Sequence, residues 1–216
     1  TLFRSDSLVY PNAPVIYVCT ESVTASNNYC TDTTIVPAPI ALNENCIGNG
    51  VLSFDGPNDG AVIYNNSVLS GTFTVECWAK PMHPSNYSVI MGSRWPVDFG
   101  FDMKFGNGNI IHGDIGNGST WLTTSADAPL NYVVGTWYHI AYVVTPSGYS
   151  IYIDGVLSGS GAFSGTPLLY GFGRNLSLGA LGANTPFNSE PMIGDLDEVR
   201  IWNIARTQSE INYNMN

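Results

Sequence analysis

Short runs of alternating apolar and polar residues recur along the chain from about residue 49 to its end. In "FTVECWAK", for example, Phe73, Val75, Cys77 and Ala79 share one face of a predicted strand. Turn-forming residues separate the runs at intervals of about ten residues, which is typical of a sandwich or jelly roll. We therefore predict an all-β fold of two packed antiparallel sheets. The runs include "GVLSFDG", "FGFDMKFG", "NIIHGDIG", "TWYHIAYVVT", "YSIYIDG" and "DEVRIWN".

Two local signals predict how particular strands end and where a helix begins. Asp154-Gly155 lies between two alternating runs and is a strong signal for a two-residue hairpin turn. The sequence "TQSE" is a capping box, with Thr207 as the N-cap and Glu210 at the third helical position. This box predicts a helix of two turns at most, close to the C-terminus.

Residues 1–48 have a different character from the rest of the chain. Four prolines interrupt this region, and "VIYV" at residues 15–18 is its clearest strand. We predict an extended N-terminal arm over residues 1–48, followed by a jelly-roll domain over residues 49–216. An arm of this kind frays unless something holds it, and its strand could add to the sheet edge of a neighbouring copy.

Four cysteines in an acidic, lysine-poor chain favour an oxidising compartment over the alternative of buried free thiols in the cytosol. Cys19 and Cys30 flank a polar loop, and a disulfide there would contribute roughly 3 kcal/mol of stability. Cys46 and Cys77 would then join the arm to the domain, although other pairings stay open. The chain begins at Thr1 without a signal peptide. We interpret it as the mature form of a secreted or cell-surface protein.

The charge balance excludes two classes of partner. The chain has 7 Lys and Arg against 17 Asp and Glu, for a net charge of −10. Nucleic-acid binding needs clustered basic residues, and these are scattered. An anionic membrane surface is disfavoured for the same reason, and no apolar run is long enough for a membrane-spanning helix.

Several motifs together carry a resemblance to a known family. The segments "LSFDGPNDGAVI", "TFTVECWAKP", "GTWYHIAYVVTPSGYSIYIDGVLSGSG", "LSLGAL" and "IGDLDEVRIWNIARTQSEI" follow one another in the order and spacing of the laminin-G-like, concanavalin A-like jelly-roll family. The resemblance covers residues 49–214 and leaves the arm outside. It implies adjacent first and last strands and a non-catalytic extracellular role in glycan binding, adhesion or protein contact. It also implies a structural calcium ion in many members.

If the first and last strands are neighbours, four carboxylates come near each other. Calcium takes about six to eight oxygen ligands, and Asp55, Asp59, Asp195 and Asp197 could supply the charged ones. The alternative is that Asp55 and Asp59 only build a turn, as Asp often does. We predict a structural calcium site at these four residues.

Catalytic motifs are incomplete. Relatives with this jelly roll hydrolyse β-glucans with carboxylates at alternate positions of one strand, but Val199 follows Asp195 and Asp197 on that face. His83, His112 and His139 lack a zinc-binding spacing. We interpret His139 as a hydrogen-bonded histidine of the sandwich and predict that the protein is not an enzyme.

Aromatic residues beside Asn, Asp or Gly could serve as platforms for sugars. We name Trp95, Trp121 and Tyr170 as weak candidates, the alternative being that each fills the core or covers a sheet edge. The leading hypothesis is a structural or adhesive protein that self-assembles through its arm into a filament or surface layer. The alternative is a secreted, calcium-dependent, carbohydrate-binding lectin.

Overall fold

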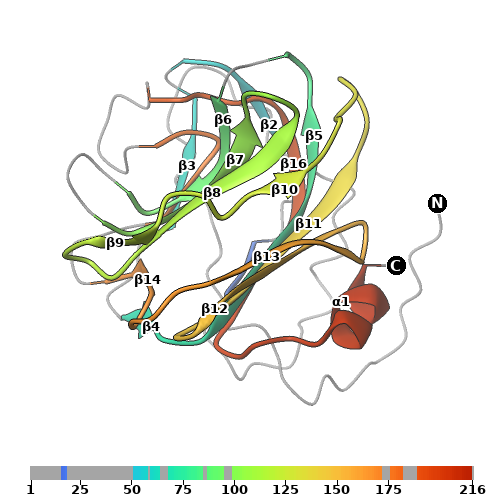
Figure 1. The fold of residues 1–216 in the computed structure, drawn as a ribbon. Helices are drawn as coiled ribbons and strands as arrows, with labels where there is room; N and C mark the ends of the chain where they lie inside the picture. Colours follow the sequence, from blue (N-terminus) through green and yellow to red (C-terminus); the bar gives the residue numbers. More distant parts are fainter. Residues whose placement is uncertain are drawn as a thin grey trace.

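The computed structural model describes residues 51–57, 59–63, 68–84, 87–94, 99–171, 176–181 and 189–215, together with the backbone of residues 16–18. Over these residues the chain forms sixteen strands and one short helix (Figure 1). No helix in this described part is long and apolar enough to cross a membrane.

Two seven-stranded antiparallel sheets make up the sandwich, which confirms the predicted fold class. The strand order in sheet A is β1 (Ile16–Val18), β16 (Ile193–Trp202), β5 (Phe73–Pro81), β11 (Tyr138–Thr145), β12 (Gly148–Ile153) and β13 (Val156–Ala162). The seventh strand, β2 (Leu52–Asp55), also pairs with β16. The strand order in sheet B is β10 (Ala128–Pro129), β8 (Ile110–Gly116), β7 (Phe101–Gly106), β6 (Tyr87–Gly92), β15 (Leu176–Leu178) and β3 (Ala61–Ile63). The seventh strand, β9 (Trp121–Thr123), also pairs with β8. A separate small pair consists of β14 (Leu168–Tyr170) and β4 (Leu69–Ser70).

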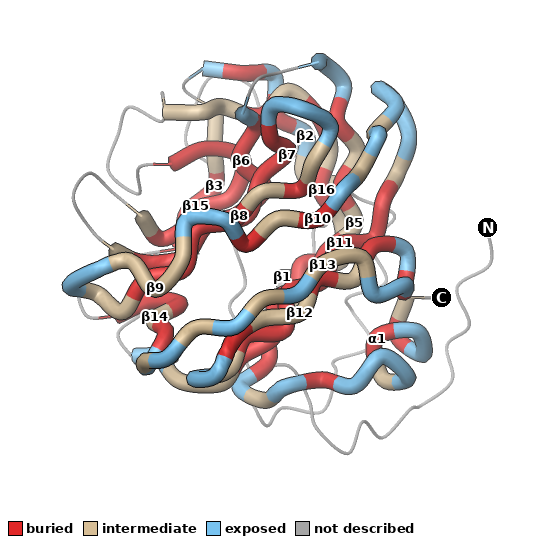
Figure 2. Tube along the Cα trace, viewed as in Figure 1, coloured by how far each residue is buried: buried red, intermediate tan, exposed pale blue. Residues whose placement is uncertain are grey.

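The core lies between the two sheets and is built from alternate residues of their central strands. Phe73 from sheet A meets the edge of Phe101 from sheet B at 5.6 Å between ring centroids. Phe101 in turn meets Tyr142 of β11 at 5.8 Å. These edge-to-face contacts join the layers, and Figure 2 shows the buried residues along the central strands, with exposed residues at the turns and along β13.

The first and last strands of the jelly roll are neighbours, as the resemblance implied. β2 pairs with the first half of β16, where Ser53 lies opposite Asp195. β1 pairs with the second half, where Val18 lies opposite Val199. The arm strand therefore adds to a sheet edge of its own domain in this structure. Most of the predicted arm lies outside the described residues.

Both local predictions are confirmed. Asp154 and Gly155 have φ angles of 49° and 75° and join β12 to β13 as a two-residue turn. The helix α1 (Gln208–Asn214) begins with the predicted capping box, in which Thr207 and Glu210 exchange side-chain and backbone hydrogen bonds. α1 packs outside sheet A through Ile211 (Figure 1).

The prediction that Cys77 forms a disulfide with Cys46 is wrong, because Cys77 is a free and wholly buried thiol. The alternation of β5 directs its side chain into the core between the sheets. Burial raises the pKa of this thiol well above its usual range. Cys19, Cys30 and Cys46 lie outside the described residues, so a link between Cys19 and Cys30 stays a prediction.

Candidate functional site

A group of charged side chains occupies the outward face of sheet B, and we call it the sheet-B patch. It arises from the alternation in β7 and β8, which sends the apolar residues of these strands inward and their charged residues outward. The strand register then places Asp102 opposite Asp114 and Lys104 opposite His112. The patch consists of Tyr87, Arg94, Asp102, Lys104, His112, Asp114, Asp127 and Glu190.

Asp102 is the centre of the patch. Its carboxylate accepts hydrogen bonds from Arg94 Nε at 2.8 Å and Lys104 Nζ at 3.1 Å. It also accepts the backbone N–H of Asp114 at 2.9 Å. Burial raises the pKa of the Asp102 carboxyl, while Lys104 and Arg94 oppose that rise. Because Asp102 is wholly buried and has three donors, it organises the patch rather than meeting a ligand.

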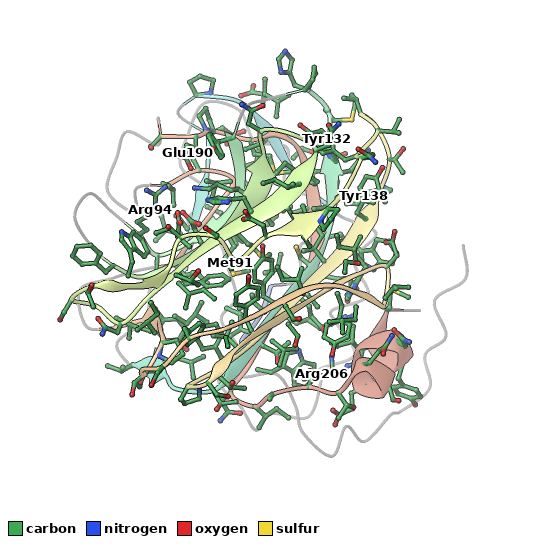
Figure 3. The ribbon with its side chains drawn as sticks, viewed as in Figure 1. Met91, Arg94, Tyr132, Tyr138, Glu190 and Arg206 are labelled. Atoms are coloured by element: carbon green, nitrogen blue, oxygen red, sulfur yellow. The ribbon has the colours of Figure 1, made fainter. Side chains whose placement is uncertain are left out.

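Glu190 brings a distant part of the chain to the same cations. Its carboxylate lies 3.0 Å from Lys104 Nζ and 3.3 Å from Arg94 Nη2. Figure 3 labels Arg94 and Glu190 on the same side of the molecule. The side chains of Arg94 and Glu190 are each 27% exposed, so this part of the patch reaches solvent.

His112 links two carboxylates at the other end of the patch. Its Nδ1 lies 2.6 Å from Asp127 Oδ1, and its Nε2 lies 3.6 Å from Asp114 Oδ1. Contact with Asp114, followed by Asp127, raises the pKa of His112 above its usual value. Tyr87 is 42% exposed, and its ring lies 5.8 Å from the His112 ring and 5.2 Å from Lys104 Nζ. Tyr87 is therefore a large aromatic surface that borders fixed charges.

Gly92 shapes the side of the patch formed by β6. It lies opposite Asp102 in the strand register. A Cβ atom at this position would lie 2.5 Å from Leu181 Cδ2 and 3.1 Å from Asp102 Cβ. Only glycine therefore lets Leu181 and Asp102 approach the strand together.

This arrangement suits a polar, uncharged or weakly charged small ligand. Such sites combine an apolar or aromatic surface with a few polar groups held in place. Here Tyr87 supplies the surface, and the partly exposed Arg94, Asp127 and Glu190 supply donors and acceptors. Ion pairs to the buried Asp102 and Lys104 fix Arg94 and Glu190 before any ligand arrives, and contact with the half-buried His112 holds Asp127.

The predicted calcium ligands do not form one cluster. Asp195 makes an ion pair of 2.5 Å with Lys80 and accepts a hydrogen bond of 2.7 Å from Ser53 Oγ. Asp59 accepts the backbone N–H of Asp55 at 2.9 Å, which is the turn-building alternative. Among the described residues, no group of three or more His, Cys, Asp or Glu could hold a metal ion. The carboxylates present give a calcium site no support, and calcium binding stays a prediction.

Asp197 and His139 lie on the outward face of sheet A, one on each side of Trp78 in the strand register. Burial and the neighbouring Glu198 raise the pKa of Asp197 to about 6. His139 is wholly buried, and neither ring nitrogen has a hydrogen-bond partner. The interpretation of His139 as a hydrogen-bonded residue is therefore wrong. Burial lowers the pKa of His139 to about 3, so its ring is neutral at pH 7.

The predicted aromatic platforms have different environments. Trp95 lies outside the described residues. Trp121 in β9 is half-buried and packs against the edge of Phe99 at 5.4 Å. Tyr170 is only 4% exposed and belongs to the core, so it is not an exposed platform for a sugar. The more exposed aromatic residue Tyr87 was missed, although it begins a strand beside the charged positions of "FDMKFG" and "IIHGDIG".

Comparison with known proteins gives one family and a consistent fold. A family model described as the concanavalin A-like lectin/glucanases superfamily matches residues 55–212. No curated protein matches the chain.

Solved structures share the fold at low sequence identity. Domain 4 of AbnA, a GH43 extracellular arabinanase from Geobacillus stearothermophilus solved with arabinotriose, is 24% identical with a TM-score of 0.52, covering 71% of each chain. The CBM40 of a Ruminococcus gnavus IT-sialidase is 12% identical with a TM-score of 0.61, covering 78% of this chain and 97% of that one. A native heptameric SAP-like pentraxin from Limulus polyphemus is 19% identical with a TM-score of 0.53, covering 74% and 78%. At these identities the likeness shows the fold alone.

Proposed function

The chain belongs to the concanavalin A-like lectin/glucanases superfamily, and we propose that it is a non-catalytic, extracellular carbohydrate-binding domain whose ligand lies on the sheet-B patch. The observation that carries this proposal is the partly exposed Tyr87, whose ring lies 5.8 Å from the His112 ring and 5.2 Å from Lys104 Nζ. These two residues in turn contact the partly exposed carboxylates of Asp127 and Glu190. The arabinanase domain solved with arabinotriose, and a second structure of the sialidase module bound to α2,3-sialyllactose, support carbohydrate as the ligand class.

The patch offers the two kinds of contact that a sugar makes. A sugar ring has an apolar C–H face, which packs on the face of an aromatic residue such as Tyr87. Its hydroxyl groups donate to carboxylates and accept from guanidinium groups, and hydrogen bonds to charged groups are the stronger kind. Because Arg94 and Glu190 are already held by Asp102 and Lys104, little side-chain freedom is lost on binding.

The arrangement of carboxylates supports a binding role rather than hydrolysis. Glycoside hydrolysis needs two carboxyl groups that both reach the scissile bond. Asp102 is covered and accepts from three donors. On sheet A, Asp195 is engaged by Lys80 and Ser53. Neither residue is poised to meet a substrate.

A glycan array followed by isothermal titration calorimetry tests this function. We expect Tyr87→Ala to weaken binding of the best array glycan about tenfold or more, because it removes the aromatic surface. Tyr213→Ala is the matched control, since Tyr213 is 59% exposed on α1, outside the opposite sheet. Binding to no glycan, or an equal loss in both variants, would contradict the proposal. A loss of binding in chelator would support the predicted calcium.

A structural or adhesive role through self-assembly is the second candidate, and the pairing of β1 with β16 favours it. Residues 19–51 separate β1 from β2 and would reach roughly 100 Å if extended. The same strand could therefore pair with β16 of another copy, as in strand addition. This pairing would join copies without using the sheet-B patch.

Cysteine substitutions at one pair of facing residues distinguish a β1–β16 pairing within one chain from a pairing between two chains. Ile16 lies opposite Ile201. We expect an equal mixture of the Ile16→Cys and Ile201→Cys variants to form a crosslink between chains, mapped by peptide mass spectrometry, if β1 is exchanged. A crosslink that forms only within the Ile16→Cys/Ile201→Cys double variant would exclude exchange and this candidate.

A further inference from the structure

Resting on the proposed function, we propose that the sheet-B patch selects glycans by charge: it accepts uncharged and amino-bearing glycans and excludes those with carboxylate or sulfate groups. The observations behind this selection are the balance of charges in the patch, the pairing of its cations and the character of its exposed rim.

Negative groups outnumber positive ones in the patch. The net charge is −2 when His112 is neutral and −1 when it is protonated. The whole chain adds to this bias with a net charge of −10. An acidic ligand would therefore approach against repulsion that salt screens over about 10 Å. The groups counted are the carboxylates of Asp102, Asp114, Asp127 and Glu190 and the cations of Arg94 and Lys104.

Both permanent cations of the patch are already paired. Lys104 lies within 3.0–3.6 Å of the carboxylates of Glu190, Asp102 and Asp114 and is almost wholly buried. Arg94 contacts Asp102 through Nε and Glu190 through Nη2. A ligand carboxylate would meet an arginine whose charge Asp102 and Glu190 already balance, and it could gain Nε only by taking it from Asp102. Breaking a pair to the buried Asp102 is unfavourable because it strands a charge away from water.

The exposed rim of the patch accepts hydrogen bonds more than it donates them. The side chain of Asp127 is 37% exposed at one end and that of Glu190 is 27% exposed at the other, and Tyr87 is 42% exposed. Carboxylates accept hydrogen bonds and cannot donate when ionised. Sugar hydroxyls and ammonium groups donate, so they match this rim, whereas a second carboxylate repels it.

An array of glycans in matched pairs tests the selection. The pairs are lactose with sialyllactose, a neutral galactan with its sulfated form, and cello-oligosaccharides with glucosamine oligomers of the same length. For the acidic pairs, we expect the neutral partner to bind at least tenfold more tightly at low salt and the gap to narrow at high salt. We expect glucosamine oligomers to bind at least as well as cello-oligosaccharides.

Charge variants test whether the sheet-B patch causes the weaker binding of acidic glycans. Asp127→Asn and Glu190→Gln should each raise binding of the acidic partners severalfold, because each removes one negative charge from the rim. Glu210→Gln is the control, since it removes the same charge on α1, outside sheet A, where Gln also completes the capping box. An equal rise in the control would assign the effect to the overall charge and overturn the role of the patch.

These experiments distinguish a failure of the proposed charge selection from a failure of the proposed carbohydrate binding. Tighter binding of sialyllactose or the sulfated galactan than of the neutral partner, lost on Tyr87→Ala, would overturn the selection and leave the binding function standing. Binding to no glycan on the array would overturn both.

Discussion

The outward faces of the two sheets each bury an ion-pair network, and the difference between them indicates which one is a candidate site. On sheet A, Arg206 Nη1 lies 2.8 and 2.9 Å from the two carboxylate oxygens of Glu76. On sheet B, Arg94 Nε lies 2.8 Å from Asp102. Both carboxylates are wholly buried and held by arginine.

On sheet A the chain itself covers the Arg206–Glu76 pair, and the network reaches solvent beyond Arg200, at Glu198, which is 24% exposed. Arg206 stacks over Trp202 at 4.1 Å and donates to the backbone oxygen of Glu210 at the start of α1. Figure 3 labels Arg206 close to this helix. On sheet B the network reaches solvent at two places, Glu190 and Asp127, and the partly exposed aromatic residue Tyr87 lies beside it. A buried ion pair alone therefore indicates no function, whereas an organised network with an exposed aromatic residue beside it indicates a candidate site.

The largest expected effect comes from breaking the covered Arg206–Glu76 pair. Arg206→Met leaves the buried Glu76 with a hydrogen bond from Trp202 Nε1 and, as its charged partner, the more distant Arg200 at 3.5 Å. The free energy of unfolding should fall by about 3–5 kcal/mol. Arg94→Met should lower it by only about 1–2 kcal/mol, because Lys104 still pairs with Asp102 and Arg94 is partly exposed. Urea denaturation measures both values.

A double variant tests the cause of that loss. Glu76→Met combined with Arg206→Met should recover most of the stability, since no buried charge is left unpaired. If Arg94→Met is as damaging as Arg206→Met, the contrast between the two faces fails.

The next largest expected effect is a loss of folding stability at acidic pH, caused by His139 on sheet A. His139 is neutral in the fold with a pKa of about 3, while its pKa in the unfolded chain is about 6.5. The unfolded state thus binds the proton first, so stability is full above about pH 6.5 and falls as the pH drops toward 3. At pH 4 the loss from this residue should be about 3 kcal/mol.

His139→Leu checks that acid dependence. The variant should lack this loss between pH 6.5 and 4, measured by urea denaturation at each pH. It should also be no less stable than the wild type at pH 7, because the ring nitrogens make no hydrogen bonds. An unchanged pH profile in the variant would contradict the assignment.

The sequence predicts the local features of this fold better than the patch. Alternation within "FDMKFG", the Asp154-Gly155 turn and the Thr207–Glu210 box depend on residues a few positions apart, and the structure confirms all of them. The patch joins Arg94 to Glu190 across a separation of 96 residues. Neither the contact between them nor the exposure of Tyr87 follows from any local pattern.

Two of the wrong predictions concern side chains that the fold buries. Cys77 was assigned to a disulfide from its place among four cysteines, but the strand face that buries it decides its state. Tyr170 was chosen for its glycine-rich surroundings, and the packing of β14 places it in the core. Alternation in the sequence already places Cys77 on the same strand face as Phe73 and Val75, whereas the burial of Tyr170 depends on which layer covers β14, and local sequence does not contain that information.

A smaller effect distinguishes a structural Asp197 from a calcium ligand. With a pKa raised to about 6, this carboxyl is destabilising when ionised, so its penalty is absent below about pH 4 and complete above pH 6. Asp197→Asn should therefore raise the free energy of unfolding by about 1–2 kcal/mol at pH 7 and leave it unchanged at pH 4. A lower stability of Asp197→Asn, together with a wild-type loss on adding chelator, would instead favour calcium.

The smallest effect is a pH dependence from sheet B of opposite sign to that of His139. Asp114 and Asp127 raise the pKa of His112 in the fold, so its contribution is full below about pH 6.5 and is lost as the pH rises through the folded-state pKa. The loss should be at most about 1 kcal/mol because Asp127 is exposed. His112→Gln should lack it when the free energies of unfolding at pH 5.5 and 8.5 are compared. His139 therefore adds stability as the pH rises to about 6.5, whereas His112 removes stability above about 6.5. A histidine variant whose profile matches the wild type in its own range would show that this histidine is misassigned.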